Sequence, residues 1–183
     1  MSRIPTPVSI DAAPEQAQPL LEAVVQQLGS APNLFRLVAT SPASLEGLLG
    51  LNGALGSGSL DARTRERVAL AVAEINGCDY CLAAHSYLGA NIADLSPAEM
   101  TANRQGGSED AKAAAAVAFA AAVTRQRGKV SEQEFAKVRA AGYSDAEIVE
   151  IVTHVALNTL TNYINEVFET DIDFPAAAEL PTA

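Results

Sequence analysis

A repeated helix-start signal constrains the fold of this chain more than any other feature of its sequence. A serine is followed three residues later by a glutamate in Ser96–Glu99, Ser131–Glu134 and Ser144–Glu147, and Pro97 suits a first helical position. In such a capping box the serine side chain accepts a hydrogen bond from the third helical residue, and the glutamate side chain accepts one from the serine backbone. These signals, and the near absence of strand patterns, predict an all-α fold.

Further helix start and stop signals occur along the rest of the chain. Gly128 ends an alanine-rich stretch, and the four glycines between Gly50 and Gly58 are expected to fray or kink the third helix. No linker divides the sequence, so residues 1–183 should form one domain, with an N-terminal arm over about 1–17 and a C-terminal arm over about 170–183. The expected helices lie near 18–28, 33–40, 42–56, 61–75, 78–90, 97–105, 108–127, 131–141 and 144–169.

The helix expected over 61–75 should be buried on all sides, because Val68 to Ala73 is an unbroken apolar run. Glu66 and Glu74 lie in this apolar context, where a carboxylate needs a partner or has a raised pKa. Gly77 should end the helix in a left-handed conformation. Periodicity alone does not rank Glu66 above Glu74 as a functional residue.

Both cysteines and one of the two histidines of the chain follow directly, in the spacing C-x2-C-x3-H. On a helix, Cys78, Cys81 and His85 fall within an arc of about 60°. A helix N-terminus stabilises thiolates, so both sulfurs could be acidified, and the spacing permits a disulfide with little backbone movement. His85 is the natural acid or base for Cys81, because its unperturbed pKa lies close to working pH.

The net charge of the chain and the length of its longest apolar run disfavour several classes of function. A formal net charge of −10 disfavours binding to nucleic acid or to an anionic membrane. The longest apolar run, from Ala113 to Val123, is too short to span a bilayer, and the N-terminus does not resemble a signal peptide. A cytoplasmic protein is expected. In a reducing cytosol, two such close cysteines indicate redox or metal chemistry.

Several residues keep alternative interpretations. The cysteines and a histidine could bind zinc, with His154 as a fourth ligand, but the pair begins a helix rather than a knuckle loop, so we expect no metal. The cysteines could also be inert and buried. His154 and Asn158 lie on a polar stripe of the last helix that also includes Asn162 and Asn165. They could line a pocket or only hydrogen-bond within a core or subunit interface.

At these residues the sequence resembles the AhpD-like alkylhydroperoxidases of the carboxymuconolactone decarboxylase superfamily. Glu66, Cys78, Cys81 and His85 satisfy the pattern E-x11-C-x2-C-x3-H. The likeness extends to peroxidase-related members of the superfamily. It continues in the segments 31–35, 158–163 and 171–175, so it covers nearly the whole chain.

The resemblance implies a helical bundle of about eight or nine helices and a peroxidase cycle on small organic hydroperoxides. Cys81 would attack the peroxide, Cys78 would resolve the sulfenic acid as a disulfide, and Glu66 and His85 would relay protons. No bound cofactor is implied; an external dithiol of the lipoyl type would reduce the disulfide. The resemblance also implies an obligate oligomer, a homotrimer or a homohexamer.

Tyr80 departs from the best-characterised branch, which has histidine between the cysteines, so the proton network must differ. Tyr80 and Glu74 therefore join His154 and Asn158 as residues that could line or support the site. Two alternative functions stay open. One is a decarboxylase of the type that gives the superfamily its name, although that branch does not rely on a cysteine pair. The other is a non-enzymatic oligomer that senses redox state through its disulfide.

Overall fold

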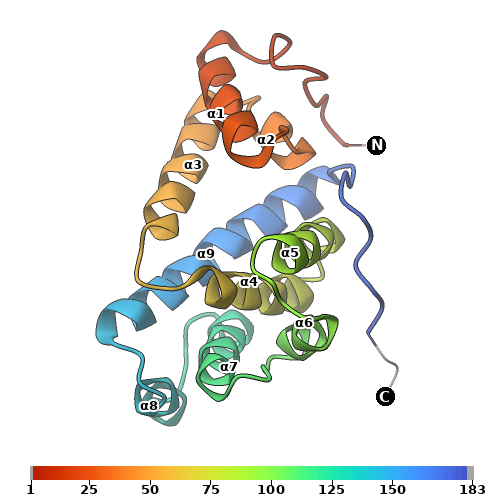
Figure 1. The fold of residues 1–183 in the computed structure, drawn as a ribbon. Helices are drawn as coiled ribbons and strands as arrows, with labels where there is room; N and C mark the ends of the chain where they lie inside the picture. The colour runs from red at the N-terminus through yellow and green to blue at the C-terminus, as the bar shows by residue number, and fades with distance from the viewer. Residues whose placement is uncertain (1, 181–183) are drawn as a thin grey trace.

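Helices are the only regular secondary structure in the part of the chain that the structure describes. The computed structural model describes residues 2–180, which contain nine α-helices and one short 3₁₀ helix, η1, at Glu15–Ala17, and no strand within that range (Figure 1). The all-α prediction is confirmed. The helices are α1 Gln18–Leu28, α2 Asn33–Val38, α3 Pro42–Gly56, α4 Ala62–Asn76, α5 Asp79–Asn91, α6 Pro97–Arg104, α7 Ala111–Gln126, α8 Glu132–Ala140 and α9 Asp145–Phe168.

Helix α4 lies at the centre of the bundle and packs against α5, α6, α7 and α9. Every residue from Val68 to Ala73 is buried, as the apolar run predicts. In Figure 1, α1, α2 and α3 lie on one side of the long helix α9, and α6, α7 and α8 lie on the other. The backbone of α4 is therefore fixed by the helices packed around it.

The capping signals are realised at two of the three predicted sites. Ser131 and Ser144 each form a complete capping box with the glutamate three residues on. Ser96 accepts a hydrogen bond from the Glu99 backbone, but the Glu99 side chain does not return to the Ser96 backbone. The third capping box is therefore only half formed, because a cation on α4 offers the Glu99 carboxylate a stronger partner.

That cation is Arg67, whose Nε lies 2.6 Å from Oε1 of the buried Glu99. Hydrogen bonds from Ser108 (2.5 Å), Asn103 (3.0 Å) and the Glu109 backbone (2.6 Å) complete the shell around the carboxylate. Burial alone would raise the pKa of Glu99, but these donors and Arg67 lower it to about 2. The network joins α4, α6 and the loop before α7.

Glu99→Gln is expected to lower the free energy of unfolding by about 3 kcal/mol at pH 7, since each unit of pKa shift is worth roughly 1.4 kcal/mol. The carboxylate is stabilising above its ordinary pKa, and this stabilisation is lost as pH falls toward about 2. Urea unfolding at pH 7 and pH 3 measures both effects. The exposed Glu46→Gln serves as the control and should change stability by less than about 0.5 kcal/mol. Equal effects of the two substitutions at pH 7 would contradict this account.

Helix α3 corrects the prediction that its glycines fray or kink it. The helix is continuous from Pro42 to Gly56, through both Gly50 and Gly53. Its other face carries the buried Leu45, Leu48 and Leu55. Burial of these leucines offsets the cost of the helical glycines, which is about 1 kcal/mol each.

The chain ends hydrogen-bond to the bundle and to each other. The Arg3 backbone donates to the carbonyl of Phe168 (2.8 Å), and the Arg3 side chain pairs with Glu169 at 2.6 Å. Ala13 and Ala17 are buried in the core. Parts of both predicted arms, residue 1 and residues 181–183, lie outside the described residues. Within residues 2–180, no helix combines the length and apolarity that a membrane span requires.

Candidate active site

A tight turn between α4 and α5 positions the cysteines. Gly77 ends α4 with a φ of 68°, which glycine adopts without strain, and the next residue, Cys78, is the N-cap of α5. The Cys78 sulfur accepts a hydrogen bond from the Cys81 backbone (3.4 Å). Cys81 thus lies in the first turn of α5, and His85 lies one turn further along the same helix.

The two sulfurs share a hydrogen bond. The Cys78 thiol donates to Sγ of Cys81 across 2.9 Å, and both cysteines are free and buried. This hydrogen bond, followed by the charge of His85, lowers the pKa of Cys81 to about 6 despite burial. The same hydrogen bond, together with burial and the neighbouring charge, raises the pKa of Cys78. The expectation that both thiols are acidified is therefore wrong, because the pair retains one proton and Cys78 holds it.

Two asparagines of α9 favour the Cys81 thiolate. The Asn165 amide donates to Sγ of Cys81 at 3.2 Å, and Asn162, one turn earlier on the helix, also lowers the pKa of Cys81. Asn162 is held in turn by the Asn76 amide at 2.8 Å. The sequence analysis placed both asparagines on a polar stripe but did not predict that this stripe faces Cys81. The spacing of four and three residues between Asn158, Asn162 and Asn165 shows that they share one face of an apolar helix, which is the signal that could have indicated a site.

His85 and Glu66 form an ion pair beside the sulfur. Nδ1 of His85 lies 2.8 Å from Oε2 of Glu66, and each side chain is about one-fifth exposed. Burial alone would lower the pKa of His85, but the charge and hydrogen bond of Glu66 raise it, with smaller contributions from Cys81 and Asn158. The site therefore brings together the Cys81 sulfur, the His85 ring and the Glu66 carboxyl group, with the pKa of Cys81 lowered and that of His85 raised.

Alkylation of Cys81 by iodoacetamide is expected to rise with pH around a midpoint of about 6, because only the thiolate reacts and it is lost as pH falls through this pKa. Asn165→Ala should move the midpoint upward by removing a donor to the sulfur. The rate is measured by mass spectrometry between pH 4.5 and 9.5. Asn91→Ala is the matched control, since its amide donates only to the Tyr87 carbonyl. A wild-type midpoint near 8.5, the value of a free thiol, would contradict this assignment.

A cleft of about 940 Å³ opens onto Cys81. Glu66 and His85 line it as well, but Cys78 does not, so Cys81 presents the accessible sulfur. Leucine and aromatic side chains make up much of the remaining wall: Leu34, Phe35, Leu48, Tyr87, Leu88, Leu157 and Phe174.

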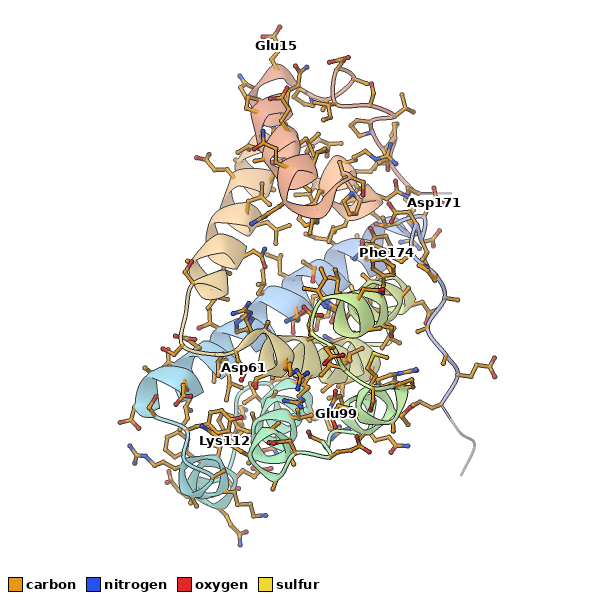
Figure 2. All side chains as sticks on the ribbon, in the orientation of Figure 1. Glu15, Asp61, Glu99, Lys112, Asp171 and Phe174 are labelled. Carbon is orange, nitrogen blue, oxygen red and sulfur yellow. The ribbon has the colours of Figure 1, made fainter. Side chains whose placement is uncertain are left out.

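Tyr80 lines the same cleft, but its hydroxyl serves the fold. It donates to Oδ1 of Asp173 (2.8 Å) and accepts from the Leu34 backbone (3.1 Å). Burial raises the pKa of Tyr80, so the phenol stays neutral. Phe174 packs edge-on against Tyr80, with 5.8 Å between ring centroids, and its position against α5 is visible in Figure 2. Tyr80 therefore holds the segment after α9 over the cleft.

The structure separates the remaining predicted residues. Glu74 pairs with Nε of Arg104 at 2.7 Å and does not line the cleft, so it belongs to the α4–α6 contact. His154 and Asn158 both line the cleft. The Asn158 amide donates to the His154 carbonyl (2.8 Å), and its side chain also hydrogen-bonds to His85. Asn158 is thus part of the cysteine site.

The zinc interpretation finds no support in this geometry. His154 precedes Asn165, which touches Cys81, by eleven residues on α9, or about 16 Å along the helix axis. Zinc ligands lie about 2 Å from the metal, so His154 cannot share an ion with the two cysteines. Within residues 2–180, no three His, Cys, Asp or Glu side chains form a group suited to a metal ion.

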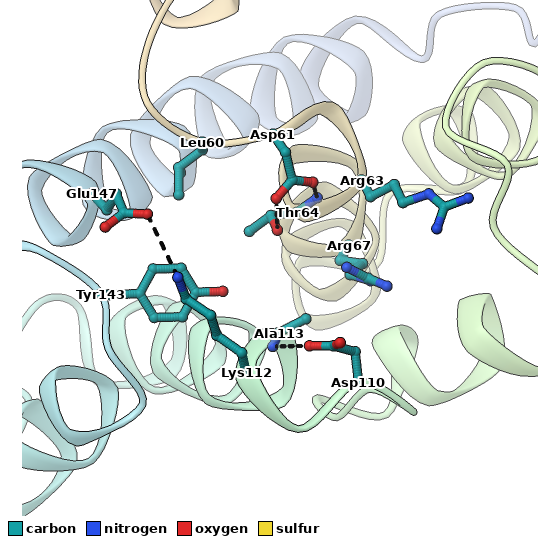
Figure 3. A pocket seen from close by; sticks show the side chains of 10 residues that line it. All are labelled: Leu60, Asp61, Arg63, Thr64, Arg67, Asp110, Lys112, Ala113, Tyr143 and Glu147. Atoms are coloured by element: carbon teal, nitrogen blue, oxygen red, sulfur yellow. Dashed lines mark hydrogen bonds and ion pairs between the residues drawn. The ribbon is translucent and has the colours of Figure 1, made fainter.

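A second pocket, of about 320 Å³, lies away from the cysteines between α4, α7 and α9 (Figure 3). Its charged groups already have partners. Asp61 and Asp110 cap α4 and α7, while Lys112 lies 3.9 Å from Glu147 and over the ring of Tyr143. Among the described residues that line this pocket there is no cysteine and no unpaired buried polar side chain.

Comparison with known proteins agrees with this arrangement. Residues 42–124, which contain Glu66, both cysteines and His85, match the Carboxymuconolactone decarboxylase family. Residues 42–124 thus belong to the carboxymuconolactone decarboxylase family, as the AhpD-like pattern of Glu66, Cys78, Cys81 and His85 indicates. No protein of curated function matches it in sequence.

Several solved structures share its fold. A peroxidase-related protein from Ralstonia eutropha JMP134, described as an alkylhydroperoxidase AhpD core, is 23% identical with a TM-score of 0.83, over 94% of this chain and 92% of that chain. A peroxidase-related protein from Silicibacter sp. TM1040 is 26% identical with a TM-score of 0.75, over 92% of each chain. The debrominase Bmp8, solved with 2,3,4-tribromopyrrole, is 21% identical with a TM-score of 0.80, over 94% of each chain. The fold therefore serves more than one reaction.

Proposed function

We propose that this superfamily member is a thiol-dependent peroxidase that reduces organic hydroperoxides through Cys81 and Cys78. One observation carries the proposal: the accessible sulfur in the cleft has a pKa of about 6 and lies 2.9 Å from a second thiol. A thiolate with a resolving thiol at that distance is suited to two-electron oxidation and disulfide formation. The His85–Glu66 pair supplies the proton that such a reaction needs.

In the first step the Cys81 thiolate attacks the terminal oxygen of the hydroperoxide. A sulfur–oxygen bond forms and the oxygen–oxygen bond breaks. The leaving alkoxide takes a proton from the His85 imidazolium, which gives an alcohol and the sulfenic acid of Cys81. Glu66 keeps His85 protonated before the attack, because its charge raises the pKa of the imidazole.

In the second step Cys78 attacks the sulfur of Cys81. A disulfide forms, and the proton of the Cys78 thiol leaves with the sulfenic hydroxyl as water. Its hydrogen bond to Cys81 and its burial keep Cys78 protonated, and burial also keeps it away from the hydroperoxide until its neighbour is oxidised. An external dithiol, of the lipoyl class that the superfamily resemblance implies, then reduces the disulfide and is itself oxidised to a cyclic disulfide.

A coupled assay with cumene hydroperoxide and dihydrolipoamide tests the proposal. One molecule of dihydrolipoamide should be consumed, and one molecule of alcohol formed, for each molecule of hydroperoxide consumed. No turnover with this pair, or with other dithiols and alkyl hydroperoxides, would refute a peroxidase.

The alternatives make different predictions in the same preparation. A decarboxylase would keep its activity on a carboxylated lactone when both cysteines are replaced by serine. A redox-sensing oligomer would change size between the reduced and oxidised states without turnover. The acidified Cys81 that lines the cleft favours thiol chemistry over the decarboxylase, which does not rely on a cysteine pair. Turnover of hydroperoxide separates the peroxidase from the sensor, because a sensor cysteine shares the same acidity and access.

We also propose that the chain forms a homo-oligomer through α9. Its outer face carries exposed apolar residues at spacings of three and four, which form a stripe that another copy of the same helix could cover: Val149, Val152, Ala156, Leu160, Tyr163 and Val167. The cytoplasm stays the expected location. Sedimentation of the purified protein tests the assembly, including the trimer and hexamer that the resemblance implies.

A further inference from the structure

The cleft carries a cation that the peroxidase cycle does not use. Arg65, on α4, is the only lysine or arginine among the described residues that line it. Its Nη1 donates to the carbonyls of Leu60 (2.8 Å) and Gly56 (3.3 Å). Its Nε and Nη2 have no hydrogen-bond partner among residues 2–180, and these are the two atoms that grip a carboxylate side-on.

The nearby carboxylates do not neutralise Arg65. Of the two that line the cleft, Glu66 pairs with His85, and Asp173 accepts from Tyr80 and from the Asn33 backbone. Glu150, close to His154, accepts from the backbone amides of Ser59 and Leu60. No carboxylate oxygen of the described residues lies within 4 Å of the Arg65 guanidinium.

His154 provides a second unsatisfied group in the same cleft. It is 5% exposed, and its Nε2 is buried without a hydrogen-bond partner within residues 2–180. Burial, reinforced by the charge of Arg65, lowers the pKa of His154 to about 4, so the ring is neutral at pH 7 and can donate one hydrogen bond. A buried polar atom left without a partner is costly, and a ligand in the cleft would remove that cost.

The order of residues along α9 sets the length of the ligand. Asn165 touches the Cys81 sulfur, Asn158 touches His85, and His154 lies one further turn away. The sulfur and His154 are therefore separated by about 12 to 16 Å along the helix. Leu157 and Leu48 contribute apolar wall to this cleft. A ligand that reaches from one end to the other needs a polar head and an apolar body.

We propose that Arg65 and His154 form a subsite for the carboxylate of an extended apolar carboxylic acid, which places the far part of its chain at Cys81. The substrate would then be a hydroperoxide of a medium- or long-chain carboxylic acid. This assignment of the substrate rests on the proposed peroxidase function, whereas the subsite itself does not. Carboxylate binding can therefore be tested without turnover.

Calorimetry with decanoate and with methyl decanoate tests the subsite in the reduced full-length protein. Decanoate should bind wild type at least about tenfold more tightly than the ester does, and Arg65→Gln should remove this difference. Arg65→Lys should retain part of it, because the charge remains while the side-on geometry is lost. Arg63→Gln is the matched control, since Arg63 pairs with Asp94 outside the cleft and should leave decanoate binding unchanged. His154→Phe should weaken decanoate binding and not ester binding.

Each outcome has a separate meaning. Equal binding of acid and ester to wild type, or a preference for the acid that survives Arg65→Gln, would overturn the subsite. If Arg65→Gln fails to fold, Arg65→Lys and His154→Phe still decide the question. An Arg65-dependent affinity for decanoate in a protein that turns over no hydroperoxide would support the subsite and refute the peroxidase. With turnover present, KM for a hydroperoxide of a long-chain acid should rise in Arg65→Gln and stay unchanged for its methyl ester.

Discussion

Cys81→Ser is expected to abolish hydroperoxide turnover to the background of the assay. Serine cannot form a sulfenic acid, and its hydroxyl is not ionised near neutral pH, so neither oxidation step can begin. The buried Cys78 cannot substitute, because it does not line the cleft and its pKa is raised. Coupled consumption of cumene hydroperoxide and dihydrolipoamide measures the loss. Turnover above a few per cent of wild type would assign the attack to another group.

Cys78→Ser separates the two roles of the pair. This variant should lose steady turnover with the dithiol but still consume one hydroperoxide per chain, leaving a sulfenic acid at Cys81 that dimedone captures. Its rate of attack should fall at pH 6, because the hydrogen bond from Cys78 is the largest factor that lowers the pKa of Cys81. Dimedone labelling of Cys78 in the Cys81→Ser variant would reverse the assignment.

His85→Gln is expected to lower turnover by a factor of about 10² to 10⁴, the usual range for loss of a positioned acid or base. The substitution removes the proton donor to the leaving alkoxide, and it also removes a positive charge that stabilises the Cys81 thiolate. Glu66→Gln should have a smaller effect in the same direction, because burial then lowers the pKa of His85 without an opposing charge. Rates at pH 7 and pH 8 with saturating dithiol measure both effects.

Glu74→Gln is the matched control for Glu66→Gln. Both glutamates lie on α4 and both have a cationic or protonated partner, but Glu74 faces Arg104 rather than the cysteines. Its substitution should leave turnover within about twofold of wild type and act only on stability. Equal losses from the two substitutions would show that the effect of Glu66 is structural.

The fold was largely predictable because its determinants are local. Capping residues and apolar runs specify each helix within a few neighbouring residues, so the observed helix ends differ from expectation by only a few positions. The start of α7 is an example: Asp110 caps it, and Ser108 and Glu109 turn away to the Glu99 network. The later start of α7 follows from the Glu99 network, in which Arg67 is a partner. Arg67 lies 32 residues before Glu99, so no local sequence pattern reveals this contact.

The site was predictable only in part for the same reason. The spacing of Cys78, Cys81 and His85 on one helix follows from helical geometry, whereas the contact of Asn165 with the sulfur spans 84 residues of sequence. The choice of Glu66 over Glu74 came from the family pattern, and the structure adds the physical reason: only Glu66 reaches His85. The asymmetry between the two thiols also needed coordinates, since it depends on which sulfur donates the shared hydrogen bond and which one accepts from Asn165.

Oxidation of the reduced protein by one equivalent of an organic hydroperoxide tests the central claim most directly. Mass spectrometry of intact and digested protein follows the two cysteines at pH 7 without any reductant. The account predicts the loss of two hydrogen atoms per chain and a Cys78–Cys81 linked peptide, with one alcohol formed per chain and no reaction in Cys81→Ser. Both thiols remaining free after complete mixing with the hydroperoxide would contradict it.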